Sequence, residues 1–469
     1  MTGRFEYPFD MPSEQAVAMA DGAKPGRPAG VPSSYDLGGS TRWTPEAIAE
    51  AHALSRLGRY QIRGFNTFNH RLPTFDDLTF VPATMTRLPL EGYRESCDTR
   101  TVLGNRPGLV AKPLELDIPI YIASMSFGAL SANAKAALGY GASKVGTMTC
   151  TGEGGMLEDE REASQKLVYQ MTPSRYGLDL DHLRRADAIE LVVGQGAKPG
   201  TGGLLLGMKV SDRVADMRTL PQGVDQRSTV RHPDFLGADD MQVKIEELRE
   251  ATNYQIPILC KMGATRPRFD VAIAAKAGVD IVVVDGAEGG TGASPELLLD
   301  HTGIPTISAI RAAREAIDDS GMADQVSLVA AGGIRSGVDA AKCLALGADA
   351  VMIGTAGLMA LGCNSPRYFE DYAAMGTSPG RCHHCHTGRC PVGITTQDPE
   401  LEKRMDVAAG AERVARLLTA MTMEISLLAK ACGKSSVHNL EVEDLRALSL
   451  EASAFTGVKL AGIDRPFTW

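Results

Sequence analysis

Short apolar runs alternate with alanine-rich stretches between residues 117 and 355. Eight of these runs have the length and composition of buried β-strands, and the intervening segments, such as 132–141, 268–277 and 338–346, are predicted helices. The runs are 118–123, 145–149, 166–170, 189–193, 257–261, 281–285, 326–331 and 350–353. Eight strands with helical crossovers predict an α/β fold of the (β/α)8 or TIM-barrel type. A doubly wound open sheet is the alternative, although no G-x-G-x-x-G motif follows the first run.

The chain is predicted to have three parts. Residues 1–110 form an irregular and partly helical extension, residues 111–360 form the barrel, and residues 361–469 carry a cysteine-rich loop followed by helices. Residues 1–40 are rich in Pro, Gly and Ser, whereas Thr44 and Pro45 are an N-cap and first-turn pair that predicts a helix reaching about Leu57.

Glycine and polar residues follow almost every predicted strand. These segments are 124–128, 151–155, 194–200, 261–263, 285–292, 332–333 and 354–355. Tight turns alone would explain glycine in one or two loops, but not the same chemistry at nearly every strand end. Since TIM-barrel sites lie at the carboxyl ends of the strands, these loops are predicted to form the active site.

Three cysteines, Cys382, Cys385 and Cys390, lie within nine residues in a C-x2-C-x4-C pattern, and Pro391 follows. This spacing favours an iron–sulfur site. A zinc site remains an alternative, with a fourth ligand from His383, His384 or His386, and so do unliganded thiols. A disulfide is the least favoured reading, because nothing else indicates an oxidising compartment.

The loops after the seventh and eighth runs contain Gly332 and Gly333, and Gly354 and Thr355. In this fold these two loops commonly hold a phosphate, because glycine lets backbone N–H groups approach its oxygens. A phosphate-bearing cofactor beside an iron–sulfur centre favours flavin mononucleotide (FMN). Lys261 ends an apolar run, where a charge is costly unless it faces an anion. The anion is the flavin's pyrimidine edge, a substrate carboxylate, or a buried partner such as Asp285 or Glu153.

The composition excludes several classes of function. The net charge is −9, from 48 basic and 57 acidic residues, which argues against a nucleic-acid-binding surface. The first residues lack the apolar core of a signal peptide, and no stretch has the apolar length of a membrane span. Isolated cysteines in apolar runs fit a reducing compartment. We therefore expect a cytoplasmic protein without a nucleic-acid or membrane partner.

Five motifs together resemble the FMN-binding synthase domain of glutamate synthase. They occupy residues 124–131, 151–155, 195–200, 289–295 and 390–394, and the resemblance extends over roughly residues 110–445. It implies a (β/α)8 barrel, FMN, a 3Fe–4S cluster and reduction of a 2-iminoglutarate-type intermediate. It also implies that Glu153 is a catalytic acid/base and that Lys261 contacts the substrate, with Lys198 bordering the site. The implied cofactor-binding residues are Ser124, Met125, Ser126, Thr151, Gln195, Lys261, Gly289, Gly290, Gly332, Gly333, Gly354 and Thr355.

The first cluster cysteine departs from the family pattern. In the family it follows an Ala-Leu-Gly motif, which here precedes Cys363, about eighteen residues before Cys382. Cys385 and Cys390 match the last two ligands. We expect Cys382 to be the first ligand, because the local C-x2-C needs no chain reversal. If Cys363 also binds, the four cysteines could hold a 4Fe–4S cluster.

The chain also has no length for the family's amidotransferase and β-helix regions. This layout resembles the third subunit of N-methylglutamate synthase (methylamine–glutamate N-methyltransferase), and it implies a hetero-oligomer with separate amidotransferase-like and β-helix-like subunits. The implied reaction makes N-methylglutamate from glutamate and methylamine through 2-iminoglutarate. One alternative is a glutamate synthase subunit acting on 2-oxoglutarate and ammonia. The other is a non-catalytic flavoprotein scaffold, against which Glu153 and Lys261 argue.

Overall fold

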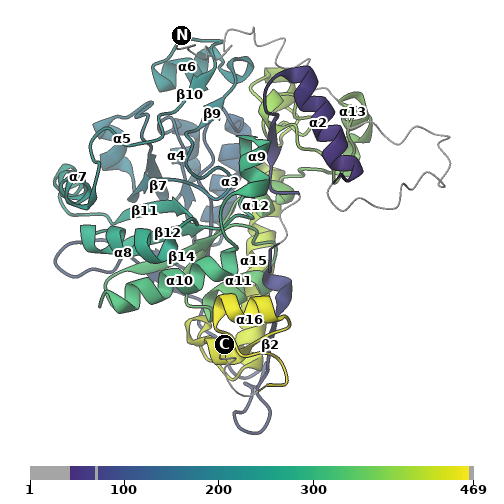
Figure 1. The fold of residues 1–469 in the computed structure, drawn as a ribbon. Helices are drawn as coiled ribbons and strands as arrows, with labels where there is room; N and C mark the ends of the chain where they lie inside the picture. The colour runs from purple at the N-terminus through teal and green to yellow at the C-terminus, as the bar shows by residue number, and fades with distance from the viewer. Residues whose placement is uncertain (1–42, 69–71, 464–469) are drawn as a thin grey trace, which may run out of the picture.

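The computed structural model describes residues 43–68 and 72–463, and its centre is a sheet of eight parallel strands (Figure 1). The strands are β5 (Ile120–Ile122), β6 (Thr149–Cys150), β7 (Leu167–Met171), β8 (Ala188–Val192), β11 (Ile258–Gly263), β12 (Ile281–Asp285), β14 (Ser327–Ala331) and β15 (Ala350–Ile353). Each predicted run supplies one of them, and the spatial order β5-β15-β14-β12-β11-β8-β7-β6 makes consecutive strands neighbours throughout.

The second strand is shorter than predicted and lies later in the chain. The run 145–149 contributes only its last residue to β6, because residues 145–147 turn out of the preceding helix. Gly146 has a φ of +66°, and a Cβ at this position would lie 2.0 Å from Asp117 Oδ2. Glycine is therefore required here both for its backbone conformation and for its lack of a side chain.

The two end strands of the sheet meet and close the barrel. Across this seam, the Ile122 N–H donates to the Met148 carbonyl at 3.1 Å, and the Thr147 hydroxyl donates to the Ile120 carbonyl at 2.6 Å. An open, doubly wound sheet would leave its end strands without this contact. The predicted (β/α)8 barrel is thus confirmed, and the open-sheet alternative is wrong.

Side chains alternate between the inside and the outside of the barrel, as the period of a β-strand requires. On β11, Leu259 belongs to the interior cluster, whereas Ile258 and Cys260 belong to the cluster shared with the surrounding helices. On β11 and β12 the row of side chains that faces the barrel interior ends in a charged residue, which is Lys261 on β11 and Asp285 on β12. The charged groups of the site therefore lie directly above the apolar side chains that fill the barrel interior.

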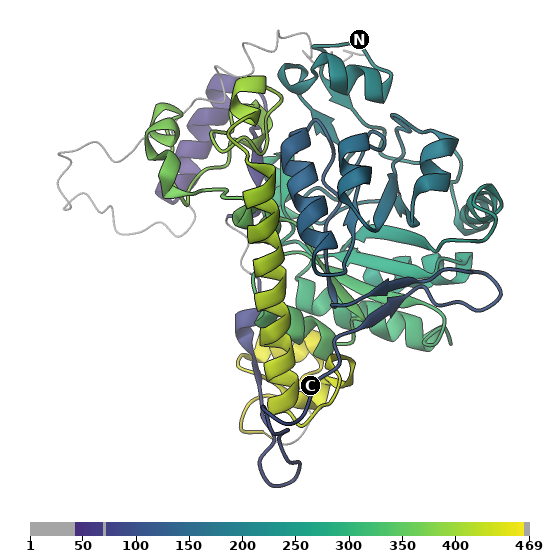
Figure 2. The same cartoon turned by 180° about the vertical axis from the view of Figure 1, so that it is seen from behind.

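Helices cover the outside of the barrel. They include α3 (Ala132–Ser143), α7 (Ala238–Ala251), α8 (Pro267–Ala277), α10 (Thr306–Asp319) and α11 (Gly337–Ala345). The 25-residue α15 (Val407–Ala431) packs against α3 and α11 and runs along the back of the molecule (Figure 2). None of the helices in the described ranges has both the length and the apolar character needed to cross a membrane.

The N-terminal extension pairs with distant parts of the chain. Its helix α2 (Pro45–Leu57) begins as predicted, with the Thr44 hydroxyl accepting a hydrogen bond from the Ala47 N–H at 3.2 Å. Strand β1 (Ile62–Phe65) pairs with β13 (Thr291–Pro295), and β2 (Leu78–Phe80) pairs with β16 (Leu445–Ala447). The hairpin of β3 (Thr101–Leu103) and β4 (Leu114–Leu116) adds side chains to the barrel interior. The predicted irregular segment 1–40 lies outside the described residues.

Candidate active site

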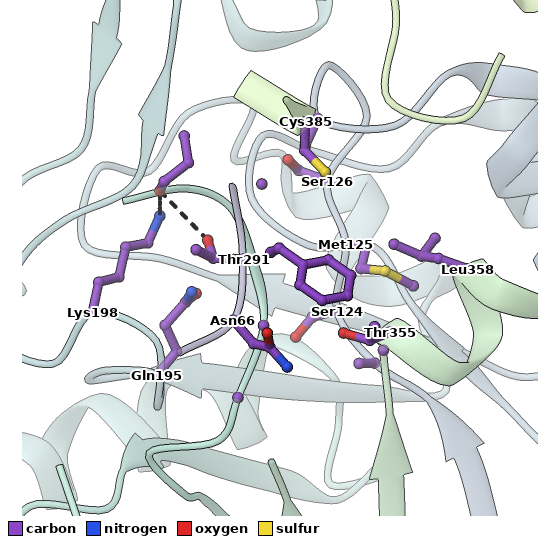
Figure 3. A pocket seen from close by; sticks show the side chains of 18 of the residues that line it. Asn66, Ser124, Met125, Ser126, Gln195, Lys198, Thr291, Thr355, Leu358 and Cys385 are labelled. Atoms are coloured by element: carbon purple, nitrogen blue, oxygen red, sulfur yellow. Dashed lines mark hydrogen bonds between the residues drawn. The ribbon is translucent and has the colours of Figure 1, made fainter. Parts of the chain in front are cut away.

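A cavity of about 1020 Å³ lies at the carboxyl ends of the barrel strands (Figure 3). Its wall contains residues from every strand-end segment that the sequence singled out. The predicted site residues that line it are Ser124, Met125, Ser126, Glu153, Gln195, Lys198, Lys261, Gly289, Gly290, Gly332, Gly333, Gly354, Thr355, Cys382, Cys385 and Cys390. The structure thus brings together almost the whole predicted set.

Thr151 is the predicted residue that lies behind the wall. Its side chain is buried, its hydroxyl donates to the Gly152 carbonyl at 2.9 Å, and the same oxygen accepts from the Gln170 N–H at 2.9 Å. Its own carbonyl accepts a hydrogen bond from the buried Lys135. Thr151 therefore joins the loop after β6 to strand β7 and does not line the space.

Lys261 lies at the floor of the cavity beside a carboxylate. Its ammonium nitrogen is 3.8 Å from Asp285 Oδ2 and 3.3 Å from the Ser124 hydroxyl oxygen. Burial alone would lower the pKa of Lys261, but the nearby Asp285 and Glu190 carboxylates outweigh that effect and raise the pKa above its ordinary value. Of the two ion-pair partners considered from sequence, Asp285 is the one that the structure provides, while Lys261 still faces the cavity.

Glu190 is a site residue that the sequence reasoning missed. It is 1% exposed, and its Oε1 accepts hydrogen bonds from the Ser124 hydroxyl at 3.2 Å and from Gln170 Nε2 at 2.8 Å. The available signal was a glutamate inside an otherwise apolar run. Glu190 ties the loop after β5 to β7 and β8 directly beneath the cavity.

Glu153 occupies a different part of the wall. Its Oε1 accepts hydrogen bonds from the hydroxyls of Thr172, at 3.1 Å, and of Ser174 and Ser228. These three donors fix the orientation of the carboxylate and leave Oε2 near Gly203, where a Cβ would lie 2.3 Å away. Glu153 does not form an ion pair with Lys261 in the described structure.

Lys198 is a second buried ammonium group in the wall. Its Nζ donates to the Ala293 carbonyl at 3.0 Å, the contact drawn in Figure 3. Burial lowers the pKa of Lys198 to about 8, although the charge of Glu153 opposes this change. A lysine with this pKa can exchange protons close to neutral pH.

Glycines leave backbone amides free at one end of the cavity. Gly332 and Gly333 have φ values of +104° and +70°, which disfavour residues with a Cβ. Within the described residues, the N–H groups of Gly332, Gly333 and Gly354 donate to no protein acceptor. A Cβ at Gly290 would lie 2.7 Å from the Thr355 hydroxyl oxygen. Unpaired amides around a narrow space can bind the oxygens of a phosphate.

The cysteine-rich loop forms another side of the cavity. Cys363 lines the cavity together with the three predicted ligands. Asn364 joins the two candidate first ligands, because its Nδ2 lies 3.4 Å from Cys363 Sγ and its Oδ1 accepts from the Cys382 N–H at 3.1 Å. Burial, together with the neighbouring Cys390 and Cys382, raises the pKa of Cys385 to about 12. Such a thiol needs a strong positive partner to ionise.

A buried lysine contacts the cysteine-rich loop. Lys209 is 2% exposed, and its Nζ donates to the carbonyls of Ala129 at 2.8 Å and Cys385 at 3.0 Å. Among the residues that the structure describes, no three His, Cys, Asp or Glu side chains are close enough to hold a single metal ion. In a 3Fe–4S or 4Fe–4S cluster each cysteine binds a different iron, so the thiols need not converge on one point.

The chain is similar to known proteins over most of its length. The family described as the conserved region in glutamate synthase matches residues 70–435. A glutamate synthase large subunit-like protein of Rhizobium meliloti (strain 1021) is 56% identical over 415 residues, which are 88% of this chain and 93% of that protein. An archaeal-type glutamate synthase (NADPH) of Thermotoga neapolitana is 33% identical over 451 residues, covering 92% and 86%.

The fold also has relatives among solved structures. A mutant flavocytochrome b2 with sulfite bound superposes with a TM-score of 0.51 at 17% identity, and the match covers 89% of each chain. At this identity the likeness concerns the barrel fold alone. The family match covers more than half of the chain, and two relatives exceed 30% identity over most of its length. The chain therefore belongs to the glutamate synthase family.

Proposed function

We propose that the chain is the catalytic subunit of an FMN enzyme that forms N-methylglutamate from glutamate and methylamine, releasing ammonia through a 2-iminoglutarate intermediate. The proposal rests on one observation above all. A single cavity joins the Lys261–Asp285 pair, the glycine amides and the cysteine-rich loop. A non-catalytic scaffold would have no need for this combination of buried charges.

FMN fits the chemistry of the wall. Gly332, Gly333, Gly354 and Thr355 are suited to the phosphate, because three of their amides have no protein acceptor in the described structure. Ser124, Met125, Ser126, Gln195, Gly289 and Gly290 would hold the ring system. When bound, FMN would supply reversible hydride transfer, so that a hydride removed from the α-carbon of glutamate could be returned to the methylated imine and the net reaction would need no external reductant.

Lys261 binds negative charge at the reacting end of the cavity. Its raised pKa keeps the ammonium protonated at neutral pH, and Asp285 and Ser124 hold its position. A substrate carboxylate or the electron-rich edge of the flavin is the anion that it faces. Because the group is 5% exposed, little water competes for the interaction.

Glu153 and Lys198 are suited to proton transfer at the amine. Glu153 presents a carboxylate fixed by three hydroxyl donors, and Lys198 has a pKa of about 8. In the proposed reaction Glu153 accepts a proton from the incoming methylamine and delivers one to the leaving ammonia. The cavity wall around both groups keeps water from hydrolysing the imine.

The cysteine-rich loop would hold an iron–sulfur cluster. Cys382, Cys385 and Cys390 would bind a 3Fe–4S cluster, and a 4Fe–4S cluster would add Cys363. The buried Lys209 beside Cys385 balances part of the negative charge of such a cluster. In a redox-neutral reaction the cluster need not turn over. A zinc site would need the thiols to converge on one ion, which the described side chains do not do.

Glutamate synthase activity is the second candidate. It is favoured by the archaeal-type relatives, whose names describe NADPH-dependent glutamate synthases and which align with 90–92% of this chain. Both reactions use the same imine and the same cavity. They differ in the amine and in the source of the hydride. For the first reaction we propose a cytoplasmic hetero-oligomer with amidotransferase-like and β-helix-like subunits that deliver and retain the amine.

Isotope transfer distinguishes the two candidates. The assembled complex is given methylamine and glutamate deuterated at the α-carbon, without an external reductant. We expect N-methylglutamate that carries deuterium at the α-carbon, diluted where the borrowed hydride exchanges with solvent. If product forms only when NADPH or reduced ferredoxin is supplied with 2-oxoglutarate, the glutamate synthase reading replaces the proposal.

A further inference from the structure

A short segment of the N-terminal extension forms part of the cavity wall. Phe65, Asn66 and Thr67, which we call the strap, line the same space as Lys261. Nothing in the sequence marked these residues, because they lie in the mixed region before the barrel. Figure 3 shows the Asn66 carboxamide within the cavity, between Gln195 and Thr355. The strap begins at Phe65, the last residue of β1, and β1 pairs with β13, which directly follows Gly289 and Gly290.

A buried ion pair anchors the strap. Arg63 is 4% exposed, its Nη2 lies 2.7 Å from Asp300 Oδ1, and its Nη1 donates to the Asn66 carbonyl. The same Asp300 oxygen accepts from the Thr67 hydroxyl at 3.0 Å and from the Phe68 N–H at 2.8 Å. Burying such a pair is expensive, and the hydrogen bonds from Thr67 and Phe68 tie the strap to it.

The backbone of the strap is strained and closely packed. Phe65 has a φ of +81°, a conformation that is unfavourable for a bulky side chain. A Cβ at Gly64 would lie 2.8 Å both from Cys385 Cβ and from the Gly292 carbonyl oxygen, and the Gly64 N–H donates to the His383 carbonyl at 3.0 Å. The residue that leads into the strap is therefore held between Gly292 and the cysteine-rich loop. Strain of this kind persists where the surrounding structure fixes a functional conformation.

We propose that the strap is a cofactor-binding element in which the Asn66 carboxamide hydrogen-bonds to the ring system of the flavin. This inference rests on the proposed function. A Cβ at Gly290 would lie 3.5 Å from the Phe65 carbonyl oxygen and 2.7 Å from the Thr355 hydroxyl oxygen, so the strap adjoins the two loops assigned to FMN. A carboxamide offers both a donor and an acceptor. It therefore matches a heterocycle whose N–H and C=O groups are adjacent, as in the pyrimidine ring of a flavin.

FMN titration of the apoprotein tests the strap, with flavin fluorescence as the signal. Asn66→Ala should raise the Kd for FMN about tenfold, the scale of one hydrogen bond to a buried ligand. The matched control is Asn105→Ala, an exposed asparagine between β3 and β4, which should keep the wild-type Kd. Asp300→Asn, which weakens the anchor, should raise the Kd as well.

A second measurement separates contact from folding. Asn66→Asp keeps the size of the side chain but adds negative charge, so it should lower the flavin midpoint potential, whereas a purely structural role would leave the potential unchanged. An Asn66→Ala Kd within twofold of wild type, or an unchanged potential in Asn66→Asp, would overturn the inference and leave the proposed function intact. Failure of the wild-type chain to bind FMN would overturn both.

Discussion

Removing the charge of Lys261 tests whether the buried pair at the cavity floor serves stability, catalysis or both. Lys261→Met keeps length and apolar volume but leaves Asp285 and Glu190 buried without their cation. At the 3.8 Å separation of the Lys261–Asp285 pair, the Coulomb energy is about 4 kcal/mol for an effective dielectric constant of about 20. Breaking a buried pair from one side typically destabilises a protein by about 3–5 kcal/mol.

We therefore expect two separable losses in Lys261→Met. The free energy of unfolding should fall by roughly 3–5 kcal/mol, and turnover should fall by about two orders of magnitude, the usual scale for a lost electrostatic contact at a reacting centre. The control is the double variant Lys261→Met with Asp285→Asn, which removes the uncompensated carboxylate. It should regain much of the stability but none of the turnover.

Denaturant unfolding of the apoprotein measures the first loss, and the methylamine-dependent formation of N-methylglutamate measures the second. FMN content should be measured alongside, since we expect flavin to remain bound. Wild-type turnover in Lys261→Met would refute the catalytic role and return Lys261 to a structural ion pair. Unchanged stability in the same variant would refute the electrostatic argument from the buried pair.

The remaining predictions concern the cluster and the second lysine. Cys385→Ser should remove the iron while leaving flavin absorbance, and iron and acid-labile sulfide assays check this; stoichiometric zinc without sulfide in the wild type would end the iron–sulfur proposal. Comparing Cys363→Ser with Cys382→Ser identifies the first ligand, because only the variant that loses a true ligand should lose iron. Lys198 has a pKa of about 8 when folded and an ordinary value of 10.5, so the unfolded chain binds more protons between these pH values. The cost of burying the charged Lys198 is fully present below pH 8 and is relieved as the pH rises towards 10.5. Lys198→Met should therefore stabilise the protein, and this gain, measured by denaturant titration, should shrink between pH 8 and pH 10.5. A gain that stays constant over that interval would contradict the lowered pKa.

Much of the barrel could be predicted from local patterns. Buried parallel strands need continuous apolar runs, and each of the eight runs found in the sequence overlaps one of the eight strands of the sheet. The helix that begins at Pro45 was predicted from its cap because the Thr44 hydroxyl satisfies a local N–H group. The strand-end loops were predicted to be the site because the fold collects them at one end, and they line the cavity.

Other features of the site depend on contacts between distant residues. Glu190 carried only a weak signal, a charge inside an apolar run, and its role follows from meeting Ser124 and Gln170 beneath the cavity. Whether Lys261 would pair with Asp285 or with Glu153 depended on which strands are neighbours, and β11 pairs with β12.

By itself, the sequence determined the order of strands and helices, the glycine-rich loops at the strand ends and the spacing of the three clustered cysteines. Each of these depends on residues close together in the chain. Only the tertiary structure decided that Cys363 lies with those cysteines and that the strap from the N-terminal extension completes the cavity wall. The physical reason is that the anchor of the strap joins Arg63 to Asp300, 237 residues away, and a single sequence carries no local signal for such a pairing.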